Sequence, residues 1–465
     1  TDKMTPIAFE KMLDWIAEEY KTQKSVFGIP EDKFYKKTGD NSILVFGDKC
    51  ETPIGPAAGP HTQLAQNIIA AYLTGGRFFE LKTVQILDEL EFDKPCIEAE
   101  DEGYNTEWST ELSIEQAYQE YVKAWIILPF LKKLFGLSGL EENGYVFNMS
   151  VGYDLKGIKT KKIDDFIEGL KDASQNAFFQ ECKDILNAKI NTGIFPGITE
   201  LPEMKSDISD SITLSTMHGC PPEDQEAICK YLIKEKWLNT FVKLNPTLLG
   251  YDFVRSTFDT MGYNNIILKE DSFTHDLKYD VAVQMIKRLM QFAEENKRTF
   301  GVKLSNTLPT VNEKGVLPGE EMYMSGKALY PLTINLAAKL SEEFAGKLAV
   351  SYSGGADFLN ISEIYKAGIK PITMATTLLK SGGYFRFKQI AEKLNSENSP
   401  EYVLPELLKT EAEKVLRHKT YAKDKDRVSK KTEAKLPLTD CFIAPCKYGC
   451  PINQDIPEYI KLVGE

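Results

Sequence analysis

Short runs of apolar and β-branched residues alternate with longer amphipathic segments along most of the chain. The amphipathic segments have helical periodicity, as in residues 225–237, 281–296 and 329–344. The short runs predict strands that are buried on both faces. They lie at residues 53–57, 77–82, 145–150, 211–216, 240–245, 299–304, 347–352 and 370–375.

Eight strands that alternate with helices predict an α/β protein with a (β/α)8 TIM barrel and insertions. A doubly wound parallel sheet is the alternative. That fold favours a Gly-x-Gly-x-x-Gly turn after its first strand, and the turn here, Gly55-Pro-Ala-Ala-Gly59, lacks the pattern. The barrel is therefore the preferred interpretation.

The segments outside the strand–helix alternation divide the chain further. Residues 1–50 predict an N-terminal helix and cap, and residues 51–395 the barrel. Residues 396–437 are charged and lysine-rich, with one helical piece, and predict a linker. Residues 438–465 predict the start of a small α-helical domain. The insertion 84–110, rich in acids and aromatics, follows the second strand and is either a lid over the barrel or a solvated loop.

Composition narrows the class of partner and the compartment. A net charge of −12 argues against nucleic acid as the main partner. The chain has no long apolar run that would predict a membrane span and no hydrophobic signal core at its start. The eight cysteines are too scattered for a disulfide scaffold. We expect a cytoplasmic protein, and a homo-oligomer is compatible with these features.

One loop with reactive side chains follows the fourth strand, where Pro221 and Pro222 open the next helix. His218 and Cys220 are thereby placed at the carboxyl end of a barrel strand, the end at which barrel enzymes carry their active sites. A thiol beside a helix start has a lowered pKa in many enzymes, which would suit proton transfer. The alternative is a half-buried cysteine without a catalytic role.

Two glycine- and hydroxyl-rich loops late in the barrel predict a phosphate site. Glycines let backbone N–H groups approach an anion closely, and the loops after strands seven and eight are where barrels commonly hold phosphate. The residues concerned are Ser353, Gly354 and Gly355, then Ala375, Thr376 and Thr377, with Ser325 and Gly326 as a further donor pair.

Three strands end on lysine: Lys82, followed by Thr83, then Lys243 and Lys303. A buried lysine is costly unless it meets a negative partner. Each could pair with a carboxylate inside the barrel, or together they could surround an anionic cofactor. Lys243 facing the N1–C2=O edge of a flavin would stabilise the reduced ring, and Asn306 and Thr307 could hydrogen-bond an amide-rich ring.

Residues 52–387 resemble the FMN domain of dihydroorotate dehydrogenases and dihydropyrimidine dehydrogenase. The resemblance implies FMN contacts from Ala57, Ala58 and Gly59, from Lys82 and Thr83, from the strand-end lysines and from the phosphate loops. It implies that Cys220 donates a proton. It implies substrate contacts from Asn148, Ser215, Asn306 and Thr307. The family's catalytic stretch is compressed here into Ser215–Cys220, which leaves His218 as a second candidate acid.

A cysteine cluster near the end of the chain indicates an iron–sulfur site. Cys441, Cys446 and Cys450, the last followed by proline, have the spacing of cluster ligands rather than of a zinc site. They resemble the [4Fe–4S] module of dihydropyrimidine dehydrogenase and of the glutamate synthase small subunit. Three cysteines do not complete a cubane cluster. We therefore expect further ligands downstream, in a region of a longer protein that could also bind FAD and NAD(P). The alternative is a remnant of such a module that binds nothing.

The order of barrel first and iron–sulfur module second resembles the large flavin and iron–sulfur proteins of the selenate reductase family. This resemblance implies an FMN-dependent oxidoreductase of anaerobic purine breakdown. It would reduce an electron-poor heterocycle, such as urate or a pyrimidine-like ring, with electrons from a donor domain or subunit. The alternatives are an electron-transfer subunit of a selenate or molybdenum reductase, a dihydroorotate dehydrogenase-like enzyme and a scaffold with a vestigial flavin site.

Overall fold

The structure is a computed structural model that divides into two compact units, Thr1–Ala422 and Lys423–Glu465. It describes residues 3–39, 42–91, 93–99, 102–106, 110–216, 218–313, 315, 317–423, 454, 459, 462 and 463. Cys441, Cys446 and Cys450 lie outside the described residues, as does most of the predicted domain 438–465. The account below concerns the first unit.

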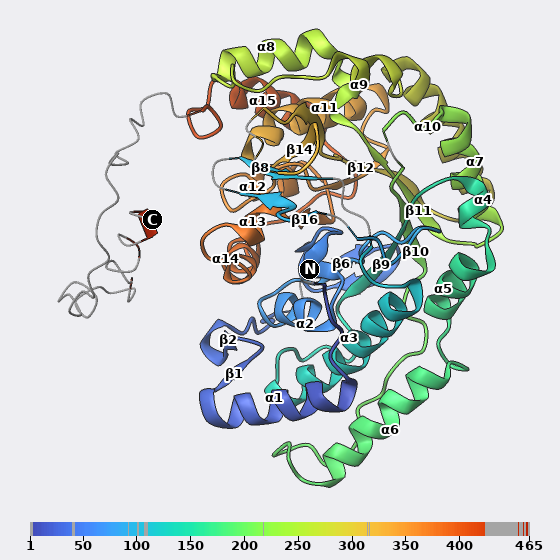
Figure 1. Ribbon diagram of the computed structural model, residues 1–465, viewed down its shortest axis with the longest axis vertical. Coiled ribbons are helices and arrows are strands. Elements are labelled where there is room, and N and C mark those ends of the chain that lie inside the picture. Colours follow the sequence, from blue (N-terminus) through green and yellow to red (C-terminus); the bar gives the residue numbers. More distant parts are fainter. Residues whose placement is uncertain are drawn as a thin grey trace. The chain divides into compact units, whose positions relative to one another are not determined.

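Eight parallel strands form the barrel, and each overlaps a predicted strand (Figure 1). They adjoin one another in the order β5-β16-β15-β12-β11-β10-β9-β6. The prediction of a (β/α)8 barrel is confirmed. The strands are β5 (Ile54–Pro56), β6 (Phe78–Glu80), β9 (Val146–Val151), β10 (Ser211–Leu214), β11 (Asn239–Leu244), β12 (Phe300–Leu304), β15 (Ala349–Tyr352) and β16 (Ile372–Met374).

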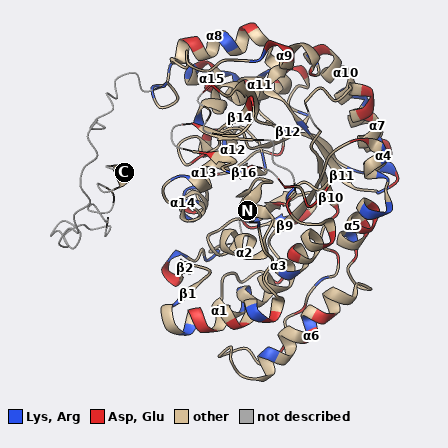
Figure 2. Ribbon diagram, in the orientation of Figure 1, with Lys and Arg blue, Asp and Glu red and all other residues tan. Residues whose placement is uncertain are grey.

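Helices surround the strands, and charged residues of both signs lie along outer helices such as α5, α6 and α8 (Figure 2). Their inward faces are apolar at helical spacing, as in α10, which buries Ala282, Met285, Ile286 and Leu289. No helix among the described residues is both long and apolar enough for a membrane span. The helices are α2 (Ala65–Leu73), α3 (Ile114–Phe135), α4 (Leu155–Ile158), α5 (Lys161–Lys171), α6 (Ala177–Asn191), α7 (Pro222–Lys234), α8 (Tyr251–Met261), α9 (Glu270–His275), α10 (Tyr279–Glu295), α11 (Tyr330–Glu343), α12 (Ile361–Lys366), α13 (Thr376–Leu379) and α14 (Phe385–Leu394).

A hairpin within residues 43–50 covers the amino-terminal end of the barrel, whereas the first helix packs on α6 of the outer layer. Helix α1 (Phe9–Gln23) is followed by the short strands β1 (Ser25–Val26) and β2 (Ile29–Pro30). The hairpin of β3 (Ile43–Val45) and β4 (Asp48–Cys50) then packs Val45 and Cys50 against Phe78 and Val146 of the barrel. These contacts seal the end of the barrel opposite to the predicted site.

A small antiparallel sheet, called the cap sheet below, covers the carboxyl ends of the strands. It contains β7 (Ile97–Glu98) and β8 (Gly103–Asn105) from the insertion after β6, with β13 (Leu308–Val311) and β14 (Glu321–Ser325) from the segment after β12. Its order is β13-β14-β8-β7. The described part of the insertion 84–110 therefore supports the lid interpretation over the solvated loop.

The predicted linker begins too early. Helix α15 (Pro405–Val415) lies within residues 396–437, yet it packs on α11 of the barrel. Its side chains Leu408, Ala412 and Val415 are buried, and Glu411 accepts a hydrogen bond of 3.2 Å from the hydroxyl of Tyr330. The assignment failed because the Lys- and Glu-rich composition of this segment hides an apolar stripe at helical spacing. The first unit extends to Ala422.

Arg77 joins the first two strands and the amino-terminal hairpin at the point where the barrel closes. Its backbone N–H donates to the carbonyl of Ile54 at 2.7 Å, and its carbonyl accepts from Val146 at 2.8 Å. Its fully buried guanidinium donates to Glu51 at 2.6 Å and to the carbonyl of Tyr72 at 2.7 Å. One residue thus connects β5, β6, β9 and the amino-terminal hairpin.

We predict that Glu51→Gln destabilises the protein by about 3–5 kcal/mol, because it leaves the Arg77 guanidinium buried without a counter-charge. The matched control is Asp165→Asn, which breaks a pair whose Lys161 and Asp165 side chains are 86% and 60% exposed. An exposed pair of this kind contributes less than about 1 kcal/mol. Urea unfolding followed by circular dichroism measures both changes. Equal effects of the two substitutions would contradict the role given to the buried pair.

Candidate functional site

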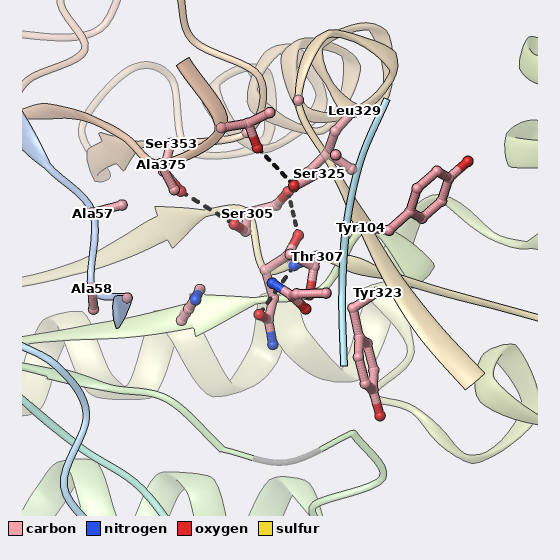
Figure 3. Close-up of a pocket in the computed structure, with 18 of the residues that line it drawn as sticks. Ala57, Ala58, Tyr104, Ser305, Thr307, Tyr323, Ser325, Leu329, Ser353 and Ala375 are labelled. Carbon is pink, nitrogen blue, oxygen red and sulfur yellow. Dashed lines mark hydrogen bonds between the residues drawn. The ribbon is translucent and has the colours of Figure 1, made fainter. Parts of the chain in front are cut away.

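A cavity of about 780 Å³ opens at the carboxyl ends of the barrel strands, under the antiparallel sheet (Figure 3). In Figure 3, Ala57 and Ala58 lie on one side of the cavity, and Tyr104 and Tyr323 of the cap sheet lie on the other. The cavity gathers most of the site residues predicted from the sequence. Those that line it are Ala57, Ala58, Gly59, Lys82, Thr83, Ser215, His218, Lys243, Lys303, Asn306, Thr307, Ser325, Gly326, Ser353, Gly354, Gly355, Ala375, Thr376 and Thr377.

The predicted phosphate loops converge at one end of this cavity. A Cβ atom added to Gly355, which has a φ of +73°, would lie 2.5 Å from the carbonyl oxygen of Gly326. The hydroxyls of Ser325 and Thr376 are 2.7 Å apart. Only glycine allows the loops this close approach together with that backbone conformation. The result is a cradle of backbone groups and hydroxyls with the composition that suits a phosphate.

The three strand-end lysines have different surroundings. Lys303 is buried in an ion pair with Glu80 of β6, and burial lowers the pKa of Lys303. The Glu80 carboxylate also accepts from Thr373 at 3.1 Å. Lys82 is likewise buried. For Lys243, the described residues supply neither an ion pair nor a hydrogen bond, and burial lowers the pKa of its ammonium to about 8. Of the three strand-end lysines, Lys243 is thus the cation that the described residues leave available to a ligand in this cavity.

The structure orients His218 through a carboxylate that sequence reasoning missed. Asp276 follows α9 and its Oδ2 lies 2.8 Å from Nδ1 of His218. Asn245 and Thr247 donate to the same oxygen at 3.1 and 2.8 Å. The N–H of Gly219 donates to the other carboxylate oxygen at 2.6 Å. Asn245 ends a predicted strand, which is a weak signal, whereas the sequence around Asp276 carries none.

Cys220 is on the same loop but is absent from the residues that line the cavity. Its thiol lies 3.8 Å from the carbonyl oxygen of Pro221. Burial and the neighbouring Asp224 raise its pKa to about 11. The expected lowering of this pKa is therefore wrong, because desolvation outweighs the start of the helix.

The four predicted substrate residues separate into two groups. Ser215, Asn306 and Thr307 line the cavity. Asn148 is instead buried among the barrel strands, where its amide donates to Thr213 at 2.8 Å and its carbonyl accepts from Ser211 at 2.8 Å. Both polar groups of this side chain are thus occupied within the protein.

Sequence reasoning also missed several polar residues of the wall. Tyr104 and Tyr323 come from neighbouring strands of the cap sheet. Lys269 also lines the cavity and pairs with Glu321 of the same sheet. His61 is buried beside Gly59, and neither ring nitrogen has a hydrogen-bond partner among the described residues. Burial lowers the pKa of His61 to about 4, so this imidazole is neutral near pH 7. The cap sheet is hard to predict from the sequence, because its strands come from two separate insertions that pair only in the folded barrel.

The sequence from residue 27 to 427 matches the family model described as oxidoreductase YgfK, N-terminal TIM-barrel domain. The chain belongs to this oxidoreductase family. Proteins called "Putative oxidoreductase YgfK" from Escherichia coli strain K12 and from Escherichia coli O157:H7 are each 51% identical over 480 residues. That alignment covers 100% of this chain and 46% of each relative, so the chain spans about half of their length.

A solved structure of ligand-free dihydroorotate dehydrogenase (DHODH) from Eimeria tenella shares the fold. The ligand-free enzyme has a TM-score of 0.51 at 15% identity, over 86% of this chain and 97% of that one. The enzyme in complex with ferulenol has a TM-score of 0.48 at 14% identity, over 83% and 89%. At these identities the likeness concerns the barrel alone, and the chemistry has to be argued from the cavity.

We predict that the ligand-free protein gains stability relative to its Lys243→Met variant as the pH rises from about 8 to about 10.5. Burial lowers the folded-state pKa of Lys243 to about 8, whereas the unfolded chain keeps a value of about 10.4. Within this window the unfolded state binds more protons than the folded state, so stability rises with pH. Below the window Lys243 is protonated in both states, so its effect on stability no longer changes with pH.

Urea unfolding at pH 7.5 and 9.5 gives the difference between wild type and Lys243→Met, in which the other titrating groups cancel. The control is Lys161→Met, because the Lys161 side chain is 86% exposed and its difference should stay constant. A pH-independent difference for Lys243→Met would show that this ammonium is not desolvated.

Proposed function

We propose that the protein is an FMN-dependent oxidoreductase that reduces an electron-poor heterocycle, such as a purine like urate or a pyrimidine-like ring. The observation that carries the proposal is Lys243. Its desolvated ammonium lines the same cavity as a cradle suited to phosphate. A barrel maintains such a cation at a cost in stability unless an anion compensates it.

The residues present fit FMN at both of its ends. Ser325, Gly326, Gly355 and Thr376 converge where a phosphate would be held. Ala57 and Ala58 line the cavity without long side chains, on the side opposite to Tyr104 and Tyr323 in Figure 3. Lys243 would face the electron-rich edge of the ring. Lys303 would be fixed by Glu80 and would contribute charge from the barrel interior.

When bound, FMN supplies a hydride to a substrate carbon. The chain's own residues would prepare that transfer. Lys243 stabilises negative charge on the reduced ring electrostatically. Asn306 and Thr307 orient the amide groups of a heterocycle, with the Asn306 side chain itself held by the N–H of Thr307 at 3.0 Å. The loop that carries His218 and Cys220 supplies the proton, a contribution of about 10²–10⁴-fold in rate for general acids.

Electrons are proposed to arrive through an iron–sulfur cluster with Cys441, Cys446 and Cys450 among its ligands. The spacing of these cysteines supports the proposal, and they lie outside the described residues. The donor would be a further domain or a separate subunit. An electron-transfer subunit without its own organic substrate remains the competing function.

We predict that Thr376→Asp abolishes FMN binding, whereas Thr376→Asn weakens it only modestly. The two variants have the same size and differ in one negative charge, which would repel the phosphate from the cradle. Riboflavin lacks the phosphate and meets no such repulsion, so the affinity of the protein for riboflavin should fall about equally in the two variants. Quenching of flavin fluorescence measures the four affinities. An Asp variant that binds FMN as the Asn variant does would place the phosphate elsewhere.

We predict that the protein binds FMN and that one heterocycle reoxidises its reduced form. FMN-loaded protein is reduced chemically under anaerobic conditions, and urate, xanthine, uracil, orotate and selenate are then added in turn. The flavin absorbance should return with a single heterocycle. Reoxidation by none of the heterocycles would favour the electron-transfer function, and a failure to bind FMN would overturn both.

A further inference from the structure

The buried carboxylate of Asp276 accepts several hydrogen bonds from its surroundings. Its side chain is 3% exposed and accepts from Thr247, Asn245 and the N–H of Gly219, in addition to its contact with His218. Burial alone would raise its pKa. The hydrogen bonds and the charge of His218 nevertheless hold the pKa of Asp276 below its ordinary value. It is therefore an ionised and immobile partner for one nitrogen of the imidazole.

The other nitrogen of His218 is left without a partner. Its ring stacks on Tyr323 of the cap, with centroids 5.8 Å apart and planes at 19°. Nε2 is buried, and no described residue hydrogen-bonds to it. The residue lines the cavity, whereas Cys220 does not. The ionised Asp276 carboxylate, 2.8 Å from Nδ1, can only accept and therefore places a proton on Nδ1. The Asn245 amide nitrogen is also 3.1 Å from Nδ1, and in this tautomer it donates to Asp276 alone. Nε2 is then the nitrogen left for proton transfer.

We propose that His218 is the catalytic acid of the reaction and that Asp276 is the positioning residue that sets its tautomer. This inference rests on the proposed function and deepens it, since it selects His218 over Cys220 on the loop that both occupy. Asn245, Thr247 and the backbone of Gly219 hold the carboxylate, and Tyr323 holds the imidazole plane.

The proton balance of the step follows from this arrangement. A hydride, with its electron pair, would pass from the reduced flavin to one atom of the heterocycle, which would oxidise the flavin by two electrons. The adjacent atom would accept the proton from Nε2–H of the imidazolium. His218 would then be neutral, with its remaining proton on Nδ1, bound to Asp276. A proton from solvent restores the imidazolium before the next turnover.

The first test does not require turnover. Long-range ¹H–¹⁵N correlation spectra of protein labelled at its four histidines report the tautomer of each ring, and His218→Gln assigns the signal. We expect neutral His218 to carry its proton on Nδ1, and Asp276→Asn to shift it toward Nε2, as an amide in this place is known to do in a catalytic triad. An Nε2–H tautomer in the unmodified protein would overturn the proposal.

The second test measures the rate at which reduced FMN is reoxidised by the heterocycle that succeeds with wild type. His218→Gln and Asp276→Asn should lower this rate on the order of 10²–10⁴-fold, while FMN binding and the dissociation constant of the heterocycle change little. His418→Gln is the matched control, because His418 is exposed and outside the cavity. Retained FMN binding shows that each variant is folded.

Cys220→Ser separates the two candidate acids. On the present proposal the rate of reoxidation falls far less in Cys220→Ser than in His218→Gln. A loss confined to Cys220→Ser, with normal His218 and Asp276 variants, would overturn the proposal and leave the flavin reaction intact. Wild-type protein that no heterocycle reoxidises would fail the proposed function itself. In that case the catalytic role of His218 falls, and the histidine spectra still decide whether Asp276 sets the tautomer.

Discussion

The buried pair of Arg77 and Glu51 is the interaction on which the other parts of the molecule depend. The barrel closes only when β5 and β6, at the two ends of the strand order, meet. The backbone N–H of Arg77, next to β6, makes that contact with the carbonyl of Ile54 in β5. The side chain of Arg77 pairs with Glu51, which directly follows β4 of the hairpin at the amino-terminal end. Closure of the barrel and docking of this hairpin are therefore coupled. Every loop of the site is positioned by strands that this seam holds in register.

The two ends of the barrel treat buried charge in different ways. At the amino-terminal end Arg77 is compensated within the protein, as a structural cation has to be. Toward the carboxyl end, Lys303 has Glu80, but Lys243 has no such carboxylate among the described residues. An uncompensated cation in a polar cavity lowers stability and raises affinity for an anion. The contrast separates residues that maintain the fold from those that act on a ligand.

The sequence predicted the barrel well because its strands are buried on both faces and therefore appear as short apolar runs. It also predicted the loops that line the cavity, because glycine and hydroxyl residues follow several strands whose carboxyl ends meet at one end of the barrel. It failed where the decisive contact is long-range. Asp276 reaches His218 across 58 residues of sequence, and α15 packs on α11 through three apolar positions in a charged segment. Asn148 was misplaced for the same reason, because the register of β9 against β10 sends its side chain to Thr213 and Ser211.

The antiparallel sheet over the cavity would let a rigid barrel combine the proposed cofactor site with an exchangeable substrate. The proposed phosphate cradle is built mainly from loops after β15 and β16, and the close approach at Gly355 leaves it little freedom. The imidazole of His218 is held by a carboxylate from the segment after α9 and by Tyr323 from the cap sheet. A ligand bound in the cradle can therefore stay in place while the opposite wall adjusts to another molecule. Tyr323 belongs to the cap sheet and stacks on His218, the proposed acid. A displacement of the cap sheet would therefore alter the environment of His218. Substrate entry and proton transfer would then depend on the same element, which links access to the site with the chemistry inside it.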